Sequence, residues 1–247
     1  MELKEYLDYL VDFLKDYLKK ANADGYVLGV SGGVDSAVCA QLIKRACGDN
    51  CLGLILPCYS EPTDTEDAIL ACKAANLEFK TISLNDNFDI FKKLLISSFK
   101  VENNSNSLMT FANLKARLRM LTLYATAQLK RYLVIGTDNL AEYYVGYFTK
   151  HGDGACDILP LVRLTKTEVT EAARILGVPE KIINKRPTAG LIESSYDELE
   201  LGFSYKDLDA FLRKQEIDPR IRAKIEQMHK NSAHKRALAP RPKPFRP

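Results

Sequence analysis

The sequence has few of the residues that hold metal ions, and it has no long apolar run. Its six cysteines form no CxxC pair, and only three histidines are present to join them. Reduced thiols are therefore favoured over a zinc site or a disulfide framework. No stretch approaches the length of a membrane span, and the first twenty residues are too acidic and too periodic for a signal peptide. We expect a soluble, cytoplasmic protein that does not contact a membrane.

An excess of one charge is also missing. The chain has 35 lysines and arginines against 32 aspartates and glutamates, so its net charge is only +3. This balance gives no general case for a nucleic-acid partner. With 247 residues, 46% of them hydrophobic, the chain is long enough to bury a core. It contains no repeat and no linker that would force a division, so we expect a single domain over residues 1–247.

Short apolar runs alternate with helical patterns along the chain. The runs predict strands at 26–30, 51–57, 79–84 and 132–136, and the helical patterns lie at 3–18, 37–46, 65–76, 86–99 and 113–132. Strands separated by helices of this length predict an α/β fold, a three-layer, doubly wound parallel sheet with helices on both faces. The inward stripe of the long helix is predicted to be Leu114, Leu118, Leu121, Ala125 and Leu129. Ligands of such sheets bind beyond the carboxyl ends of the strands.

A glycine-rich turn, SGGVDS, follows the first predicted strand at residues 31–36. It lacks the lysine of a Walker loop and the spacing of a dinucleotide loop. Two hydroxyls and consecutive glycine amides at a helix N-terminus suit an anion such as pyrophosphate. Asp35 would repel that anion unless a cation lay between them, which implies Mg²⁺. The alternative is an ordinary strand-to-helix turn with Asp35 or Ser36 as the helix cap. For the next helix, the predicted cap is Thr63, Asp64 or Thr65.

The segment after the last predicted strand, residues 136–166, is the richest in chemistry. Thr137 stands at a strand end, where a hydroxyl can reach a nucleotide, and Glu142 is a second carboxylate that can share the cation with Asp35. Residues 150–157 carry both charge signs around glycines and predict a flexible loop, either a lid or a plain surface turn. The polar stretch 103–107, NNSNS, predicts a mobile connection.

SGGVDS is similar to the motif of the ATP pyrophosphatase, or PP-loop, superfamily. Further blocks follow in order and resemble ammonia-dependent NAD synthetase: KARLRM, GTDNLAE, GYFTKHGDGACDILPL, LTK, RPTAGL, DELELGFSY and HKR. The resemblance implies an adenine nucleotide α hydrolase-like, Rossmann-like fold. It also implies that Mg-ATP adenylates the nicotinate carboxylate of deamido-NAD, releasing pyrophosphate, and that ammonia displaces AMP to give NAD. The functional unit that it implies is a homodimer with the dinucleotide at the interface.

The resemblance also assigns residues to sites. Those for ATP are Gly29, Val30, Ser31, Gly32, Gly33, Val34, Asp35, Ser36, Thr137, Lys166 and Thr188. Those for deamido-NAD are Arg117, Lys150, Asp157, His234 and Lys235. Asp35 and Glu142 would bind Mg²⁺, and Asp153 and Lys166 would lie near the reacting phosphate as catalytic groups.

Three positions depart from the family pattern, and two other functions stay open. The departures are Asn139, Cys156 and Gly190, where we would expect histidine, glycine and aspartate. No residues are left over for a glutaminase domain, so ammonia would be taken from solution or from a separate protein. The alternatives are another PP-loop adenylating enzyme, either tRNA-modifying or an amide ligase, and a non-catalytic adenine-nucleotide sensor. A tRNA enzyme would need a broad basic surface, and a sensor would not need two carboxylates on one metal.

Overall fold

The computed structural model describes residues 1–187 and 197–245, and it confirms the parallel sheet. The strands are β1 (Gly25–Gly29), β2 (Cys51–Ile55), β3 (Phe79–Thr81) and β4 (Tyr132–Ile135). They lie in the order β3-β2-β1-β4, and every pair is parallel. The first and last predicted strands are neighbours in the sheet, where Val27 of β1 pairs with Val134 of the edge strand β4. The third strand is shorter than predicted.

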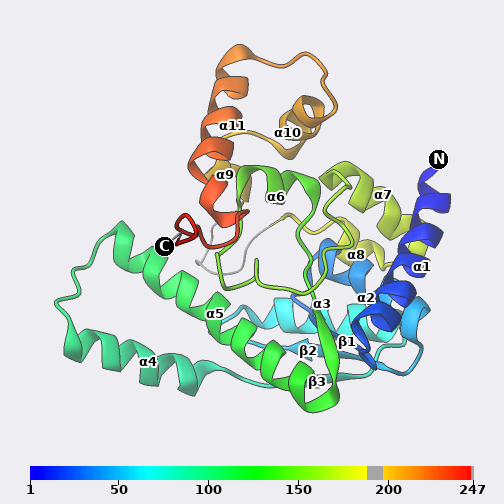
Figure 1. Cartoon of the computed structure of the whole chain (residues 1–247), viewed down its shortest axis with the longest axis horizontal. Coiled ribbons are helices and arrows are strands. Elements are labelled where there is room, and N and C mark those ends of the chain that lie inside the picture. Colours follow the sequence, from blue (N-terminus) through cyan, green and yellow to red (C-terminus); the bar gives the residue numbers. More distant parts are fainter. Residues whose placement is uncertain (188–196, 246–247) are drawn as a thin grey trace.

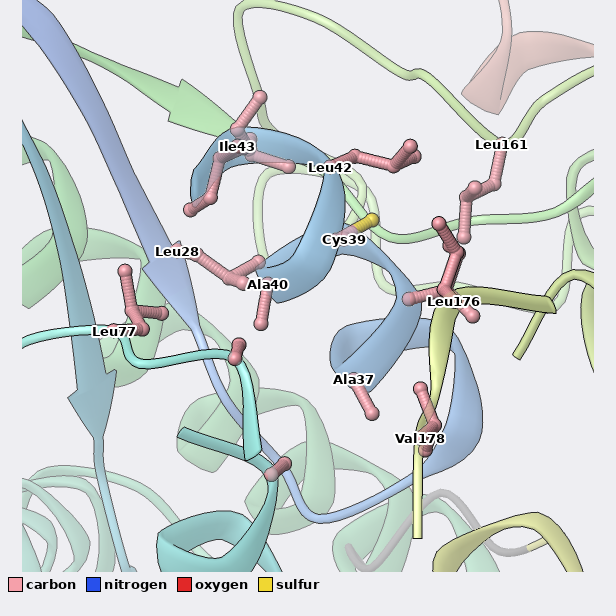
Figure 2. Packing of buried hydrophobic residues seen from close by; sticks show 14 of the residues in the cluster. Leu28, Ala37, Cys39, Ala40, Leu42, Ile43, Leu77, Leu161, Leu176 and Val178 are labelled. Carbon is pink, nitrogen blue, oxygen red and sulfur yellow. The ribbon is translucent and has the colours of Figure 1, made fainter. Parts of the chain in front are cut away.

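Helices cover both faces of this sheet (Figure 1). One layer contains α1 (Leu3–Ala21), α2 (Val34–Cys47), α3 (Pro62–Ala74), α7 (Lys166–Leu176) and α8 (Glu180–Ile183). The other contains α4 (Asn85–Ser98) and α5 (Ser105–Lys130). Alternate side chains of β1 serve the two layers, since Leu28 packs towards α2 while Val27 packs towards α5. Figure 2 shows α2 with Leu28 on one side and Leu176 and Val178 on the other. The predicted three-layer α/β fold is confirmed.

The predicted inward stripe of the long helix is wrong in register. Leu118 is buried, but Leu121 is 58% exposed and Leu129 is 87% exposed. The buried positions of α5 are instead mainly alanines, at 112, 116 and 127. Small residues let the helix lie close to the sheet. Leu114 and Leu118 pack against the core as predicted, whereas Leu121 and Leu129 point outward, so spacing alone did not give the buried face of this helix.

Two predicted helix starts also differ from the structure. Helix α3 begins with Pro62 after Glu61, so none of the three predicted caps is used. Proline at the first position loses no helical hydrogen bond, because that amide has no intrahelical partner. The NNSNS stretch leads directly into α5, where the Asn104 side chain accepts a hydrogen bond from the Ser107 amide at 3.0 Å. Polar residues predicted as a loose connection thus form a helix cap.

A smaller helical group covers one end of the molecule, above the sheet in Figure 1. It consists of α6 (Leu140–Val145), α9 (Asp197–Leu201), α10 (Tyr205–Leu212) and α11 (Pro219–Asn231), which share a separate apolar cluster around Leu208 and Ile225. A 3₁₀ turn, η1 (Ala233–Lys235), follows, and residues 237–245 have no helix, as their prolines predict. Within the described ranges, no helix is long and apolar enough to cross a membrane.

Candidate active site

A cleft of about 280 Å³ opens at the carboxyl ends of β1, β2 and β4. Most of the residues predicted for ATP, metal or catalysis line it: Gly29, Val30, Ser31, Gly33, Val34, Asp35, Ser36, Thr137, Glu142, Asp153 and Lys166. Gly32 instead packs behind the loop with φ +85°, and a Cβ there would lie 2.6 Å from the Asp64 carbonyl oxygen. Only glycine permits both this conformation and this close approach to α3. Thr188 lies outside the described residues.

The glycine-rich loop presents its donors to the cleft without a side-chain cap on α2. Gly33 occupies the cap position, so the predicted alternative with Asp35 or Ser36 as cap is wrong. The Ser36 hydroxyl donates to the Gly33 carbonyl at 3.0 Å and lies 3.2 Å from the Ser31 hydroxyl. The first amides of α2 therefore have no capping side chain to bind them. Together with the positive end of the helix dipole, they form a site for an anion.

Three charged side chains from distant parts of the chain meet beside this loop. The Lys166 ammonium lies 2.6 Å from an Asp35 carboxylate oxygen and 3.1 Å from a Glu142 carboxylate oxygen. Burial alone would lower the pKa of Lys166, but Asp35 and Glu142 outweigh it and raise the pKa above the ordinary value. Burial raises the pKa of Glu142 to about 7, although Lys166 opposes the shift. The lysine and the two carboxylates therefore form a mostly buried cluster of interacting charges, called the charge centre below.

The two carboxylates fit a magnesium site that the substrate would complete. In the described part of the chain, no group of three or more acidic, histidine or cysteine side chains is arranged to hold a metal by itself. Mg²⁺ usually takes only one or two protein carboxylates and fills its other positions with phosphate oxygens and water. Asp35 and Glu142 match that pattern, because both face the cleft beside the anion-binding loop.

Neighbouring residues that the sequence did not assign fix the orientation of these carboxylates. Asn139, one of the departures from the family pattern, donates from its side-chain amide to Asp35 at 2.8 Å. The Tyr205 hydroxyl lies 3.3 Å from Glu142 and 2.9 Å from Asp197, and the Lys166 ammonium lies 5.0 Å from the centre of the Tyr205 ring. Tyr205 belongs to the DELELGFSY block, so the sequence pointed to the segment without giving the residue a role.

Helix α7 holds Lys166 at its first position. Thr165 and Glu168 form a reciprocal capping box, which specifies where the helix begins. The Asp209 carboxylate from α10 accepts hydrogen bonds from the backbone amides of Lys166 at 3.2 Å and Thr167 at 2.8 Å. Two helices thus fix the backbone from which the lysine reaches the cleft.

The predicted loop at 150–157 brings only one of its charged residues to the cleft. Asp153 lines the cleft and accepts from the Thr149 amide at 3.1 Å. Burial raises its pKa. Asp157 lies elsewhere, where its carboxylate accepts from the Val134 amide at 2.7 Å. That bond ties the loop to β4, a strand at the edge of the sheet.

Three of the other residues predicted for deamido-NAD lie close to one another. Arg117 of α5 donates to the Lys150 carbonyl at 3.3 Å, and the Lys150 ammonium donates to the His234 carbonyl at 2.6 Å. Lys235 turns inward and donates to the carbonyls of Gly146 and Phe148. The structure therefore brings Arg117, Lys150 and His234 together but leaves Asp157 apart from them.

The fold and the cleft define an α/β protein of the nucleotide-binding type, with an anion-binding loop flanked by a lysine and two carboxylates. The chain belongs to the NAD synthase family, whose model matches residues 6–239.

Individual members of this family match the chain over nearly its whole length. It is 48% identical to the NH(3)-dependent NAD(+) synthetase of Mesoplasma florum, over 100% of this chain and 99% of that protein. Among solved structures, an NMN synthetase from Francisella tularensis has a TM-score of 0.92 and 41% identity, covering 98% of this chain and 99% of that one. The NH3-dependent NAD synthetase from Campylobacter jejuni has a TM-score of 0.80 and 32% identity, covering 98% and 100%.

Proposed function

We propose that the protein is an ammonia-dependent NAD synthetase, which converts ATP, deamido-NAD and ammonia to AMP, pyrophosphate and NAD. One observation carries the proposal within this family: Asp35, Glu142 and Lys166 converge beside an anion-binding loop. Neither a tRNA-modifying enzyme nor a nucleotide sensor is favoured. A tRNA-modifying enzyme would need a broad basic surface, which the nearly balanced charge of the chain does not suggest. A nucleotide sensor would not need a lysine and two carboxylates gathered at the anion-binding loop.

The geometry supports adenylation of a carboxylate as the first step. The loop amides and the hydroxyls of Ser31 and Ser36 would bind the pyrophosphate end of ATP, with Thr137 beside the nucleotide. The Lys166 ammonium would exchange part of its contact with Asp35 and Glu142 for the α-phosphate, where negative charge develops. When bound, Mg²⁺ held by Asp35 and Glu142 would neutralise phosphate charge. Asp153 lines the same cleft and would lie near the reacting phosphate.

The second step is amide formation. A free carboxylate resists ammonia, because its leaving group would be oxide. Adenylation makes AMP the leaving group, so the nitrogen forms the new C–N bond as the C–O bond to AMP breaks. Arg117, Lys150, His234 and Lys235 would hold deamido-NAD, with Asp157 fixing the loop that carries Lys150.

We further propose a cytoplasmic homodimer that uses α4 and α5 as its interface. These two helices and the residue after α4 expose many large apolar side chains, and exposed apolar surface of this kind marks an interaction site. The side chains are those of Ile90, Phe91, Leu94, Ile96, Phe99, Leu108, Met109, Leu121 and Leu129. Arg117 lies on the same long helix, which would bring the dinucleotide site next to the interface. The arm formed by α4 and α5 extends along one side of the molecule in Figure 1.

A mononucleotide acceptor is the second candidate substrate, because a similar solved structure is an NMN synthetase. The test is to incubate the purified protein with Mg-ATP and ammonium, adding either deamido-NAD or nicotinate mononucleotide, and to measure AMP and the amide product. We expect NAD from the dinucleotide. Faster amidation of the mononucleotide would show that it is the preferred substrate. Failure to form AMP with either acceptor would refute the proposed synthetase activity.

A matched pair of variants links the activity to the charge centre. Asp35→Asn removes the carboxylate at the start of α2 and should abolish AMP formation. Asp49→Asn, just after the same helix, removes a surface carboxylate that pairs with Lys44 and should have no effect. Equal turnover of the two variants would remove the role given to Asp35.

A further inference from the structure

Asp138 is a buried carboxyl group that has no partner in the described part of the chain. It directly follows Thr137 beyond the end of β4, lines the cleft and is only 6% exposed. Across residues 1–187 and 197–245, its side chain makes no hydrogen bond and no ion pair. Aspartate is almost never buried in this way unless it is paired, because desolvation of the charged form is costly. An unpaired carboxyl group that lines a cleft can be neutralised by a ligand bound there.

Lys166 lines the same cleft as Asp138, and the charge of Lys235 acts on Asp138, but both lysines are engaged elsewhere. Lys166 is bound to Asp35 and Glu142, and the Lys235 ammonium donates to the carbonyls of Gly146 at 2.8 Å and Phe148 at 2.7 Å. Burial, followed by the charges of Asp153, Glu142 and Asp35, holds the pKa of Asp138 well above its usual range. The carboxylate form therefore needs an added cation at close range.

We propose that Asp138 binds the ammonium ion that supplies the nitrogen of the new amide. The inference rests on the proposed function, which requires this cation to reach the cleft. Ammonium is small, carries one positive charge and has four N–H donors, so it can both neutralise a carboxylate and hydrogen-bond to it. Mg²⁺ fits less well, because it demands octahedral oxygen coordination and Asp138 offers one carboxylate beside residues already engaged.

The position suits the second step of the reaction. Asp138 lies in the chain between Thr137, which lines the cleft, and Asn139, whose side chain donates to Asp35. Ammonium held there would lie in the cleft where the adenylated carboxyl carbon forms. It must lose one proton to solvent before its nitrogen attacks, and a second proton passes from the nitrogen to solvent as the amide forms and AMP departs. Asp138 is thus assigned to binding of the nitrogen donor, separate from adenylation.

Asp138→Asn tests this assignment because it removes the charge and keeps the shape. A lost hydrogen bond between charged groups corresponds to a change of about tenfold or more, so the KM for ammonium should rise by at least that factor. The KM for ATP, and the burst of pyrophosphate formed without ammonium, should stay the same. An unchanged ammonium KM would overturn the proposal, and so would loss of the pyrophosphate burst, which would place Asp138 in the ATP site.

Asp67→Asn is the matched control, because Asp67 is also buried, at 3% exposed, but pairs with Lys181 and Lys185. It should lower the melting temperature and leave the ammonium KM unchanged.

A measurement without turnover separates failure of this inference from failure of the proposed function. The melting temperature of the full chain is compared in ammonium, potassium and sodium chloride at equal ionic strength. Ammonium should stabilise the wild type above the other two salts, and this difference should vanish in Asp138→Asn. An equal shift with potassium, or an ammonium shift that survives in the variant, would overturn the assignment even if the protein proved inactive.

Discussion

Replacing Lys166 with methionine tests whether its ammonium neutralises the charge centre. The Lys166 side chain is 10% exposed, and those of Asp35 and Glu142 are 15% and 14% exposed. Methionine fills similar space but leaves two nearly buried carboxylates facing each other. Removing one partner of a buried ion pair costs about 3–5 kcal/mol. The lower end applies here, because each carboxylate keeps some contact with the cleft.

A loss of about 3 kcal/mol would lower the melting temperature by about 6–12 °C for a chain of this size. The loss should depend on pH. Burial raises the pKa of Glu142 to about 7 even with Lys166 opposing it, so the pKa rises further in the variant. A carboxyl group with a raised pKa in the folded state stabilises the fold at low pH, and this contribution is lost as the pH rises through that pKa. The variant should therefore approach the wild type near pH 5 and differ most near pH 8.5.

The assay is thermal unfolding of both proteins without Mg²⁺ across this pH range. Lys44→Met is the control, because Lys44 pairs with a fully exposed Asp49 and its loss should leave the melting temperature nearly unchanged. A Lys166→Met protein that melts within 2 °C of the wild type at the highest pH, or whose deficit grows as the pH falls, would refute the reasoning.

Two further predictions concern the residues around this centre. Gly32→Ala should destabilise the protein by at least about 1 kcal/mol and weaken ATP binding, because φ is +85° and the new Cβ would lie 2.6 Å from the Asp64 carbonyl oxygen. Thermal unfolding and nucleotide titration would test this prediction. Gly177→Ala is the control, because Gly177 also has a positive φ but has open space around it. Tyr205→Phe should raise the Mg²⁺ concentration needed for half-maximal activity without changing the KM for ammonium, because the hydroxyl contacts Glu142 and Asp197; an unchanged Mg²⁺ requirement would contradict this role.

The general location of the cleft followed from local patterns in the sequence. Apolar runs and helical periodicities predict a parallel sheet, and such a sheet places its ligands beyond the strand ends. The SGGVDS turn then marks the strand end that binds an anion. These features depend on residues a few positions apart, so the chain order alone was enough to predict them.

The side-chain pairings of the site depended on the tertiary structure. Lys166 and Asp35 are 131 residues apart in the sequence, and Asn139 and Asp35 are 104 apart. Their contacts depend on the register of helices and strands that no local pattern specifies. The same reason explains the error in α5, because only packing decides whether alanines or leucines face the sheet.

By itself, the sequence determined the order of the elements, the loop that receives the anion and the set of charged residues available to it. Only the tertiary structure decided which of those charges neutralise one another. Lys166 is bound to two carboxylates and Lys235 to two carbonyls, whereas Asp138 has no partner among the residues that the structure describes. The physical reason is that pairing depends on distances of a few ångströms across the cleft, and the folding of the whole chain sets those distances.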